Sequence, residues 1–265
     1  MLHSPSVLVG GDGEEAYVTD VALRRIQKFG LQRDDRERLR YVRGMSRLVK
    51  SLDLTQIVSP DGKTQAQIDV EPDAMVRDEQ GTYYLLDSGT GFVTVIDSDL
   101  HLVKQWGGYG DEPGKFRSPT DITLDESARR VFVVDRLNYR IQVFDLQGDL
   151  LFSFGEYGTR PGQLLDPFGI ALDSEGRILV SDTGGNAIHI FDHDGAFIES
   201  WGSTGSDEGQ LYKPRGIVVG DDGRVLVSDY GNHRIQIFDA SGKSVAMLGW
   251  RKPRGIPNAS EKSNE

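Results

Sequence analysis

Five aspartates recur along this chain at a regular spacing, and carboxylates are the first candidates for acid–base or metal chemistry. They are Asp20, Asp87, Asp135, Asp182 and Asp229. Successive spacings among the last four are 48, 47 and 47 residues, and the first lies 67 residues before the second. Each ends an apolar run just before a turn, where a carboxylate accepts hydrogen bonds from turn amides. We therefore predict a structural role for all five. Arg25, Arg140 and Arg234, each five residues further on, could pair with them.

The remaining reactive side chains match no catalytic or metal motif. The chain has five histidines and no cysteine, so disulfides and thiolate sites are excluded. No H-E-x-x-H or G-x-S-x-G pattern is present. The acidic stretches 97–99 and 192–195 are too short to supply the roughly six oxygen ligands that calcium needs. His189 stands where two other repeats carry Gln142 and Gln236, so we interpret it as a polar strand residue. We predict no catalytic residue, no cofactor and no metal, which favours a protein that is not an enzyme.

Composition sets further limits on the kind of protein this is. With 37% hydrophobic residues the chain can bury a core, and 32 glycines against 10 prolines indicate many tight turns between short strands. A net charge of -11 disfavours general binding to nucleic acid or anionic lipid. The start of the chain lacks the features of a signal peptide, and no apolar run reaches about 18 residues. As written, the sequence predicts a cytoplasmic protein, or an exported one if an N-terminal portion is missing.

The aspartates are landmarks of a longer repeat. Pro72, Pro119, Pro167 and Pro214 lie 15 or 16 residues before them, and Trp106, Phe154, Trp201 and Leu248 lie 19 residues after them, each followed by Gly. Each unit shows four short apolar runs separated by turn dipeptides such as Asp194-Gly195. A single sheet of this size cannot cover both of its faces, whereas copies stacked around an axis can. We expect Phe144, Phe191 and Phe238, at the ends of the third strands, to be buried.

The segment DYGNHRIQIFD, from Asp229 to Asp239, resembles the core of NHL repeats, and the related segments at the other aspartates resemble it more weakly. The resemblance implies an all-β fold, a β-propeller of four-stranded blades that is usually six-bladed. We recognise five repeats, at about 5–43, 72–107, 119–155, 167–202 and 214–249, with an insertion near 44–71. The propeller then covers 1–250, followed by a polar tail at 251–265. It is either complete but irregular, or six-bladed with a portion missing.

Two faces of the propeller differ in charge and in aromatic content. The turns between first and second strands and between third and fourth strands form a strongly acidic face, here named the turn face. The second-to-third turns and the crossovers between blades form the loop face, which is nearly balanced in charge and rich in tyrosine. Aromatic residues and arginine dominate interface energetics. The predicted binding residues on the loop face are Arg136, Tyr139, Phe168, Arg215, Tyr230 and His233.

Several functional alternatives remain open from the sequence. We predict a monomeric interaction scaffold for a protein or peptide partner. NHL-related and other six-bladed propellers also include a lyase and metal-dependent hydrolases, and some NHL propellers bind RNA. Nucleic acid could bind through the basic segment 33–50, which carries a net charge of +4. Its apolar residues recur at helical spacing, but it could equally hold the fourth strand of the first blade and a basic loop.

Overall fold

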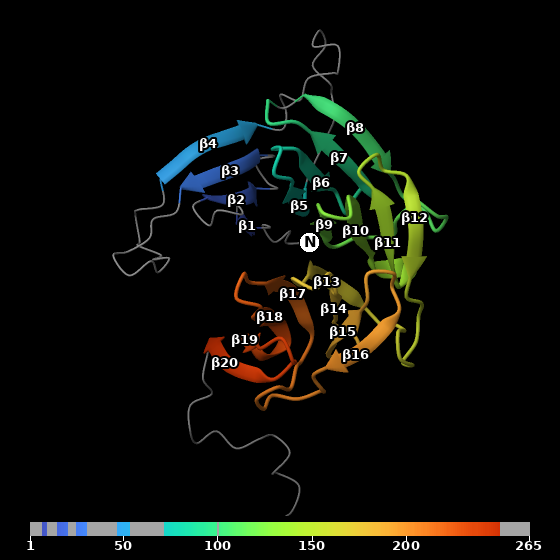
Figure 1. The fold of residues 1–265 in the computed structure, drawn as a ribbon, viewed down its shortest axis with the longest axis vertical. Coiled ribbons are helices and arrows are strands. Elements are labelled where there is room, and N and C mark those ends of the chain that lie inside the picture. Colours follow the sequence, from blue (N-terminus) through green and yellow to red (C-terminus); the bar gives the residue numbers. More distant parts are fainter. Residues whose placement is uncertain are drawn as a thin grey trace, which may run out of the picture.

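The computed structural model describes residues 72–99 and 101–249 with their side chains, and further strands of the N-terminal region as backbone. The described residues form five antiparallel sheets of four strands, each made of consecutive strands of the chain. The sheets surround a central axis as the blades of a β-propeller (Figure 1), which confirms the predicted fold class. The described part contains no helix that is long and apolar enough to cross a bilayer.

The strand bounds follow the repeat. In the first two sheets the strands are β1 (Val7–Val9), β2 (Glu15–Asp20), β3 (Arg25–Gly30), β4 (Arg47–Asp53), β5 (Ala74–Arg77), β6 (Tyr83–Leu86), β7 (Phe92–Ile96) and β8 (Leu102–Gly107). The third sheet comprises β9 (Ile122–Asp125), β10 (Arg130–Asp135), β11 (Arg140–Asp145) and β12 (Leu150–Phe154). The last two comprise β13 (Pro167–Leu172), β14 (Ile178–Asp182), β15 (Ala187–Phe191), β16 (Phe197–Trp201), β17 (Pro214–Val219), β18 (Val225–Asp229), β19 (Arg234–Phe238) and β20 (Ser244–Gly249).

The hydrophobic core lies between neighbouring blades rather than within any one of them. In each of three apolar clusters, one face of a sheet packs against the opposite face of the next sheet. Because both faces of the inner strands are covered, a strand such as β14 is buried at every position, as its continuous apolar sequence predicts. Phe144, Phe191 and Phe238 are at most 1% exposed, so the prediction that they are buried is confirmed.

The first repeat does not end at residue 43 as predicted. Strand β4 pairs with β3 and runs to Asp53, so it takes up part of the region assigned to an insertion at 44–71. Leu52 pairs with Ile26 just as Trp106 pairs with Val93, but it lies 32 residues after its aspartate instead of 19. Extra residues between β3 and β4 place Leu52, the equivalent of Trp106, further from its aspartate. Asp53 follows Leu52 where the other repeats have glycine. The end of segment 33–50 is therefore strand and not helix; its residues 33–46, like the tail at 251–265, lie outside the described residues.

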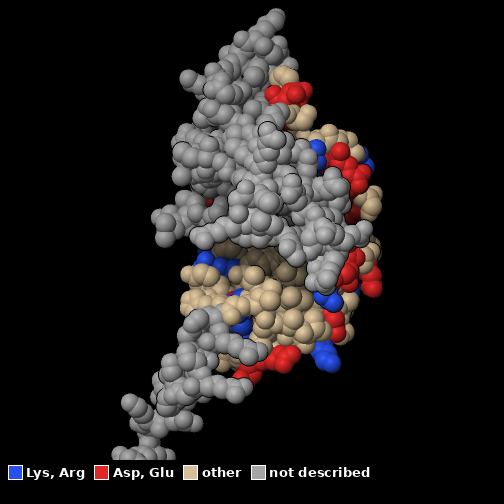
Figure 2. Space-filling model, turned by 90° about the vertical axis from the view of Figure 1, so that its left-hand side faces the viewer, with Lys and Arg blue, Asp and Glu red and all other residues tan. Residues whose placement is uncertain are grey.

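The last blade leaves one face open to solvent. The ring has an opening between the sheet β17–β20 and the sheet β1–β4 (Figure 1). Ile235 on β19 is 40% exposed, whereas Ile141 and Ile188 at the same position of the two preceding blades are 0% exposed. Leu248 is 56% exposed, and its counterpart Trp201 only 6%. Figure 2, which looks into the opening, shows this side of the last blade as mostly uncharged. Positions that bury apolar side chains elsewhere in the fold are thus uncovered here.

Candidate binding site on the loop face

The recurrent aspartates are buried acceptors at the inner ends of the loops. Asp135 is 0% exposed and accepts hydrogen bonds from the Arg117 amide (2.8 Å), the Asn138 amide group (2.9 Å) and Gln142 Nε2 (3.0 Å). Its other bond is an ion pair with Arg140 Nε at 2.8 Å. Burial raises the pKa of Asp135, although these hydrogen bonds and the arginine oppose the rise. Asp229 has the same set of partners in its own blade, including Arg234 Nε at 2.7 Å.

Two blades lack an arginine at this position and carry Phe92 or Ala187 instead, and the blade with Ala187 uses other donors. Asp182 accepts hydrogen bonds from the backbone amides of Leu165 and Asp166, both at 2.8 Å. His189 Nε2 lies 3.4 Å from its carboxylate, in the place that Gln142 and Gln236 occupy in their blades. Burial raises the pKa of Asp182, but the hydrogen bonds from His189 and from backbone amides outweigh it, so the net shift is downward. These contacts explain the recurrence of the aspartates without any reaction chemistry.

Four of the predicted binding residues form one stack across three blades. The Arg215 guanidinium carbon lies 3.9 Å from the centre of the Tyr230 ring and 5.0 Å from that of Phe168. On its other side Phe168 is contacted by Arg136, whose guanidinium carbon is 5.6 Å from the ring centre. The residues alternate as Arg136, Phe168, Arg215 and Tyr230, an order that lets each ring face a cation. We call this group the arginine–aromatic stack.

The two arginines of the stack differ in their ionic partners. Arg136, at the start of the short 3₁₀ helix η3 (Arg136–Asn138), makes a bidentate ion pair with Asp166 at 2.5 and 3.0 Å. This hydrogen-bonded ion pair raises the pKa of Arg136 above its usual value. Arg215 makes no ion pair among the described residues, and its Nε is buried without a hydrogen-bond partner. Its guanidinium is therefore held by rings alone, with donors left for another molecule.

The other two predicted residues lie beside the stack. Tyr139 packs edge-on against Tyr157, with ring centres 4.7 Å apart, and is joined to the stack by no ring contact. His233 is exposed and lines a pocket with Tyr230, which starts the 3₁₀ helix η4 (Tyr230–Asn232). The sequence did not reveal Asp166 as the partner of Arg136, because this pair joins two different blades and no spacing within one repeat signals it.

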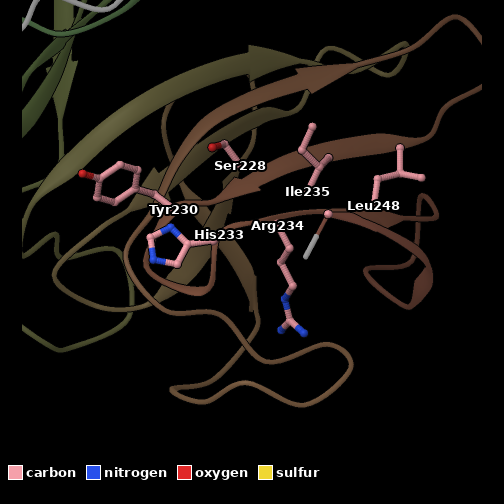
Figure 3. Close-up of a pocket in the computed structure, with 7 residues that line it drawn as sticks. Ser228, Tyr230, His233, Arg234, Ile235 and Leu248 are labelled. Carbon is pink, nitrogen blue, oxygen red and sulfur yellow. The ribbon is translucent and has the colours of Figure 1, made fainter. Parts of the chain in front are cut away.

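The pocket lies at the open side of the last blade and has a volume of about 350 Å³. We call it the edge pocket; its lining is Ser228, Tyr230, His233, Arg234, Ile235, Leu248 and Gly249. Tyr230 and His233 stand at one end, and Ile235 and Leu248 at the other (Figure 3). It therefore offers a polar, aromatic side next to an aliphatic side. The sequence did carry a signal for this pocket, because the crossover pattern that follows Gly107, Gly155 and Gly202 does not recur after Gly249.

Many acids of the turn face have structural partners. Asp97 Oδ1 accepts hydrogen bonds from the amides of Asp99 and His101 at 2.9 and 2.8 Å, and Asp192 does the same for its own turn. Asp173 caps a turn and pairs with Arg177 at 2.7 Å. The acidic character of this face thus follows largely from the turn chemistry of the blades.

Asp121 is an acid that links two blades and whose pKa is strongly shifted. Asp121 directly precedes β9, the inner strand of the third blade, and its carboxylate accepts hydrogen bonds from the backbone amides of Ile122 (2.9 Å) and of Ile170 in the next blade (3.0 Å). Burial raises the pKa of Asp121 to about 7, against the two amides that favour its charged form. The folded protein therefore binds this proton more tightly than the unfolded chain does.

We expect folding stability to fall as the pH rises from about 4 to about 7, because the buried carboxyl loses its proton in that range. Urea midpoints of the wild type and of Asp121→Asn, measured from pH 5 to 8, test this. As the pH rises, the free energy of unfolding of the wild type should fall relative to that of Asp121→Asn. Asp221→Asn, at an exposed position, should show the same dependence of stability on pH as the wild type. A constant difference would contradict the assignment.

The described residues contain no group of three or more His, Cys, Asp or Glu side chains that could hold a metal ion. What the loop face offers instead is an unpaired guanidinium between two rings and a pocket beside it. Such an arrangement can bind a ligand through stacking, hydrogen bonds and apolar contact.

Comparisons with known proteins agree with the repeat and the fold. The family model described as "NHL repeat" matches residues 211–238. "NHL repeat-containing protein 3" of Homo sapiens is 34% identical over 100 residues, which cover 35% of this chain and 28% of that protein. The matched region is thus only a small part of its relative.

Two solved structures show the same fold at low sequence identity. Virginiamycin B lyase from Staphylococcus aureus has a TM-score of 0.61 at 15% identity, covering 95% of this chain and 71% of its own. A chain of a nidogen/laminin complex has a TM-score of 0.63 at 11% identity, covering 92% of this chain and 79% of its own. Together with the five four-stranded sheets of the described residues, these matches show a β-propeller that carries an NHL repeat at residues 211–238.

Proposed function

We propose that this propeller is a non-catalytic interaction scaffold that binds a protein or peptide partner on its loop face. The observation that carries the proposal is Arg215, whose guanidinium lies between the rings of Phe168 and Tyr230 with no ionic partner among the described residues. A cation held in this way loses little conformational freedom when it binds, because its position is already fixed. A carboxylate or a main-chain carbonyl of a partner would satisfy its free donors.

The exposed aromatic residues support the same face. Four tyrosines stand out with 42–70% exposure, all from crossovers or second-to-third turns: Tyr109, Tyr157, Tyr212 and Tyr230. Tyrosine supplies a large contact area and a hydrogen bond at low entropic cost, and it is enriched at binding hot spots. The acids of the turn face, in contrast, are largely engaged with their own turns.

Single substitutions in the stack should weaken partner binding without unfolding the blade. For Arg215→Ala and Tyr230→Ala we expect a loss of about tenfold or more in affinity, as for a central interface residue. The melting temperature should fall by no more than a few degrees, because one cation–π contact contributes roughly 1 kcal/mol. The measurement is affinity capture from the native extract with wild type and variants in parallel, followed by titration of the identified partner.

The matched control is charge reversal on the turn face. Asp221→Lys serves because Asp221 is exposed, and the amide of Arg224 in the same turn bonds to Asp222 instead. Asp125 and Asp173 are less suitable, because their carboxylates cap turns. If Asp221→Lys abolishes binding and the stack variants do not, the partner binds the turn face and the proposal fails.

A further inference from the structure

The edge pocket has three filled counterparts in the same molecule. At each junction between consecutive side-chain-described blades, one apolar residue of the crossover lies against the glycine that follows the outer strand's aromatic residue. These crossover residues are Phe116, Leu164 and Leu211, each 0% exposed. A Cβ built on Gly107, Gly155 or Gly202 would lie 2.8 Å from the side chain of Phe116, Leu164 or Leu211, respectively. Each junction is thus closed by one side chain that packs against a glycine. We call the space next to this glycine, which the side chain fills, the seat.

Gly249 is the fourth glycine of this series, but its seat is open. Ile188 and Trp201 belong to the apolar cluster that surrounds Leu211. Their counterparts in the last blade, Ile235 and Leu248, line the edge pocket together with Gly249 (Figure 3). Among the described residues no side chain occupies this place, and the pocket is the result.

The sequence after Gly249 lacks the segment that fills the other three seats. Each filled crossover has the pattern G-x-x-G-x-x-x-G-[KQ]-[FL], with the apolar residue nine positions after the first glycine. Nine positions after Gly249 stands the polar Asn258, and no glycine occupies the fourth or eighth place of the pattern. The sequence after Gly249 thus has no Phe or Leu at the position that Leu211 occupies in its own crossover.

The filled seats also show the backbone shape of the segment that they accept. Phe116, Leu164 and Leu211 each form an isolated parallel β-bridge with a residue earlier in the same crossover. The seated residue is therefore part of a short extended stretch. Apart from Arg234, which lines the pocket and pairs with Asp229, the described surface around the open seat is uncharged. The exposed side of the last blade carries Val218, Leu226, Ser228, Ile235, Ile237, Ala246 and Leu248. An apolar side chain on an extended peptide fits both properties.

We propose that the edge pocket binds a partner protein through a Leu or Phe side chain on an extended segment that resembles the chain's own crossovers. This proposal rests on the proposed function and adds the recognition element, because Tyr230 belongs to both the stack and the pocket. A second copy of the chain is the alternative occupant, which the measurement of a dimer described below tests.

The probe is a synthetic peptide with the sequence STGSDEGQLYKP, taken from residues 203–214 of this chain. The peptide is added to the ¹⁵N-labelled full chain up to a peptide concentration of about 5 mM. This range approaches saturation for a Kd of roughly 1 mM. We expect saturable chemical-shift changes at Ser228, Ile235, Leu248 and Gly249. The same peptide with Ala in place of its Leu should bind roughly tenfold or more weakly, because the buried side chain supplies most of the contact.

Variants of the chain separate this proposal from the proposed function. Ile235→Arg and Leu248→Arg should abolish the shift changes, and both should fold because these side chains are exposed; a thermal melt checks that they do. Val245→Arg, on the opposite face of β20 from Leu248, should leave peptide binding unchanged. If partner capture depends on Arg215 but not on Leu248, the proposed function stands and the pocket proposal falls.

Three results would overturn the pocket proposal. The first is the absence of localised shift changes, as expected if the seat is closed by another segment of the chain in solution. The second is an equal response to the Ala-containing peptide. The third is a dimer, seen by light scattering, that Leu248→Arg dissociates, because the pocket would then belong to a second copy of the chain.

Discussion

Asp135→Ala should lower the free energy of unfolding by about 3–5 kcal/mol, since it removes one partner from a buried, hydrogen-bonded ion pair. The variant would leave the guanidinium of Arg140, the amide of Gln142 and the backbone N–H of Arg117 without their acceptor. Each buried donor without a partner keeps the full cost of its desolvation. The crossover would also lose its anchor, because Arg117 belongs to the segment that enters this blade.

Equilibrium urea denaturation with fluorescence detection measures this loss. Asp135→Asn keeps the shape and part of the acceptor capacity, so it should cost less than the alanine variant, about 1–3 kcal/mol. The matched control is Asp149→Ala, an exposed aspartate on a turn of the same blade, which should change stability by less than about 0.5 kcal/mol. If Asp135→Ala and Asp149→Ala lowered the free energy of unfolding equally, the buried carboxylate of Asp135 would not be important for stability.

Phe191→Ala should cost about 3–5 kcal/mol through the loss of buried area and the cavity that remains. Phe191 is 1% exposed, and its ring centre lies 4.8 Å from that of Phe154 in the preceding blade and 5.9 Å from that of Phe197 in its own. The change therefore loosens the junction between two blades as well as the blade that carries it. Neighbouring rings of this size cannot close the space without leaving their preferred rotamers.

The comparison for Phe191 is Ile198→Ala on the adjacent outer strand, where the side chain is 47% exposed and truncation should cost well under 1 kcal/mol. Both variants are compared in one denaturant series with the wild type. A cost below about 1 kcal/mol for Phe191→Ala would mean that β15 presents its other face to the core, contrary to the register with β14.

The strands of the last four repeats were predictable because their signals are local. A glycine turn, an apolar inner strand and an alternating third strand recur within each unit, so the sheet order follows from one repeat and its copies. The first repeat could not be bounded in the same way. Its fourth strand carries Leu52 and Asp53 where the others carry an aromatic residue or Leu248 followed by glycine. The residues added between the third and fourth strands also removed the spacing that would have identified it.

The stack was predictable only in part, because its contacts cross from blade to blade. Phe168 and Arg215 directly follow equivalent prolines, Pro167 and Pro214, and from this position the sequence predicted both on the loop face. Arg136 pairs with Asp166, whereas Arg215 has no ion pair among the described residues. This difference depends on side-chain geometry, which no repeat pattern encodes. The exposure of Ile235 and Leu248 likewise depends on whether another segment packs against their blade, and the identity of those two residues carries no sign of it.

Each described sheet is made only of consecutive strands, so none combines strands from the two ends of the chain. A ring without such a shared sheet has the cooperativity of a linear array, in which each unit is stabilised by its immediate neighbours alone. Interior units then have two supporting interfaces, whereas a terminal unit such as β17–β20 has one among the described blades. Unfolding should therefore begin by fraying at that end and propagate inward one unit at a time, and any molecule that covers the last blade would act on the whole array by supplying its missing neighbour.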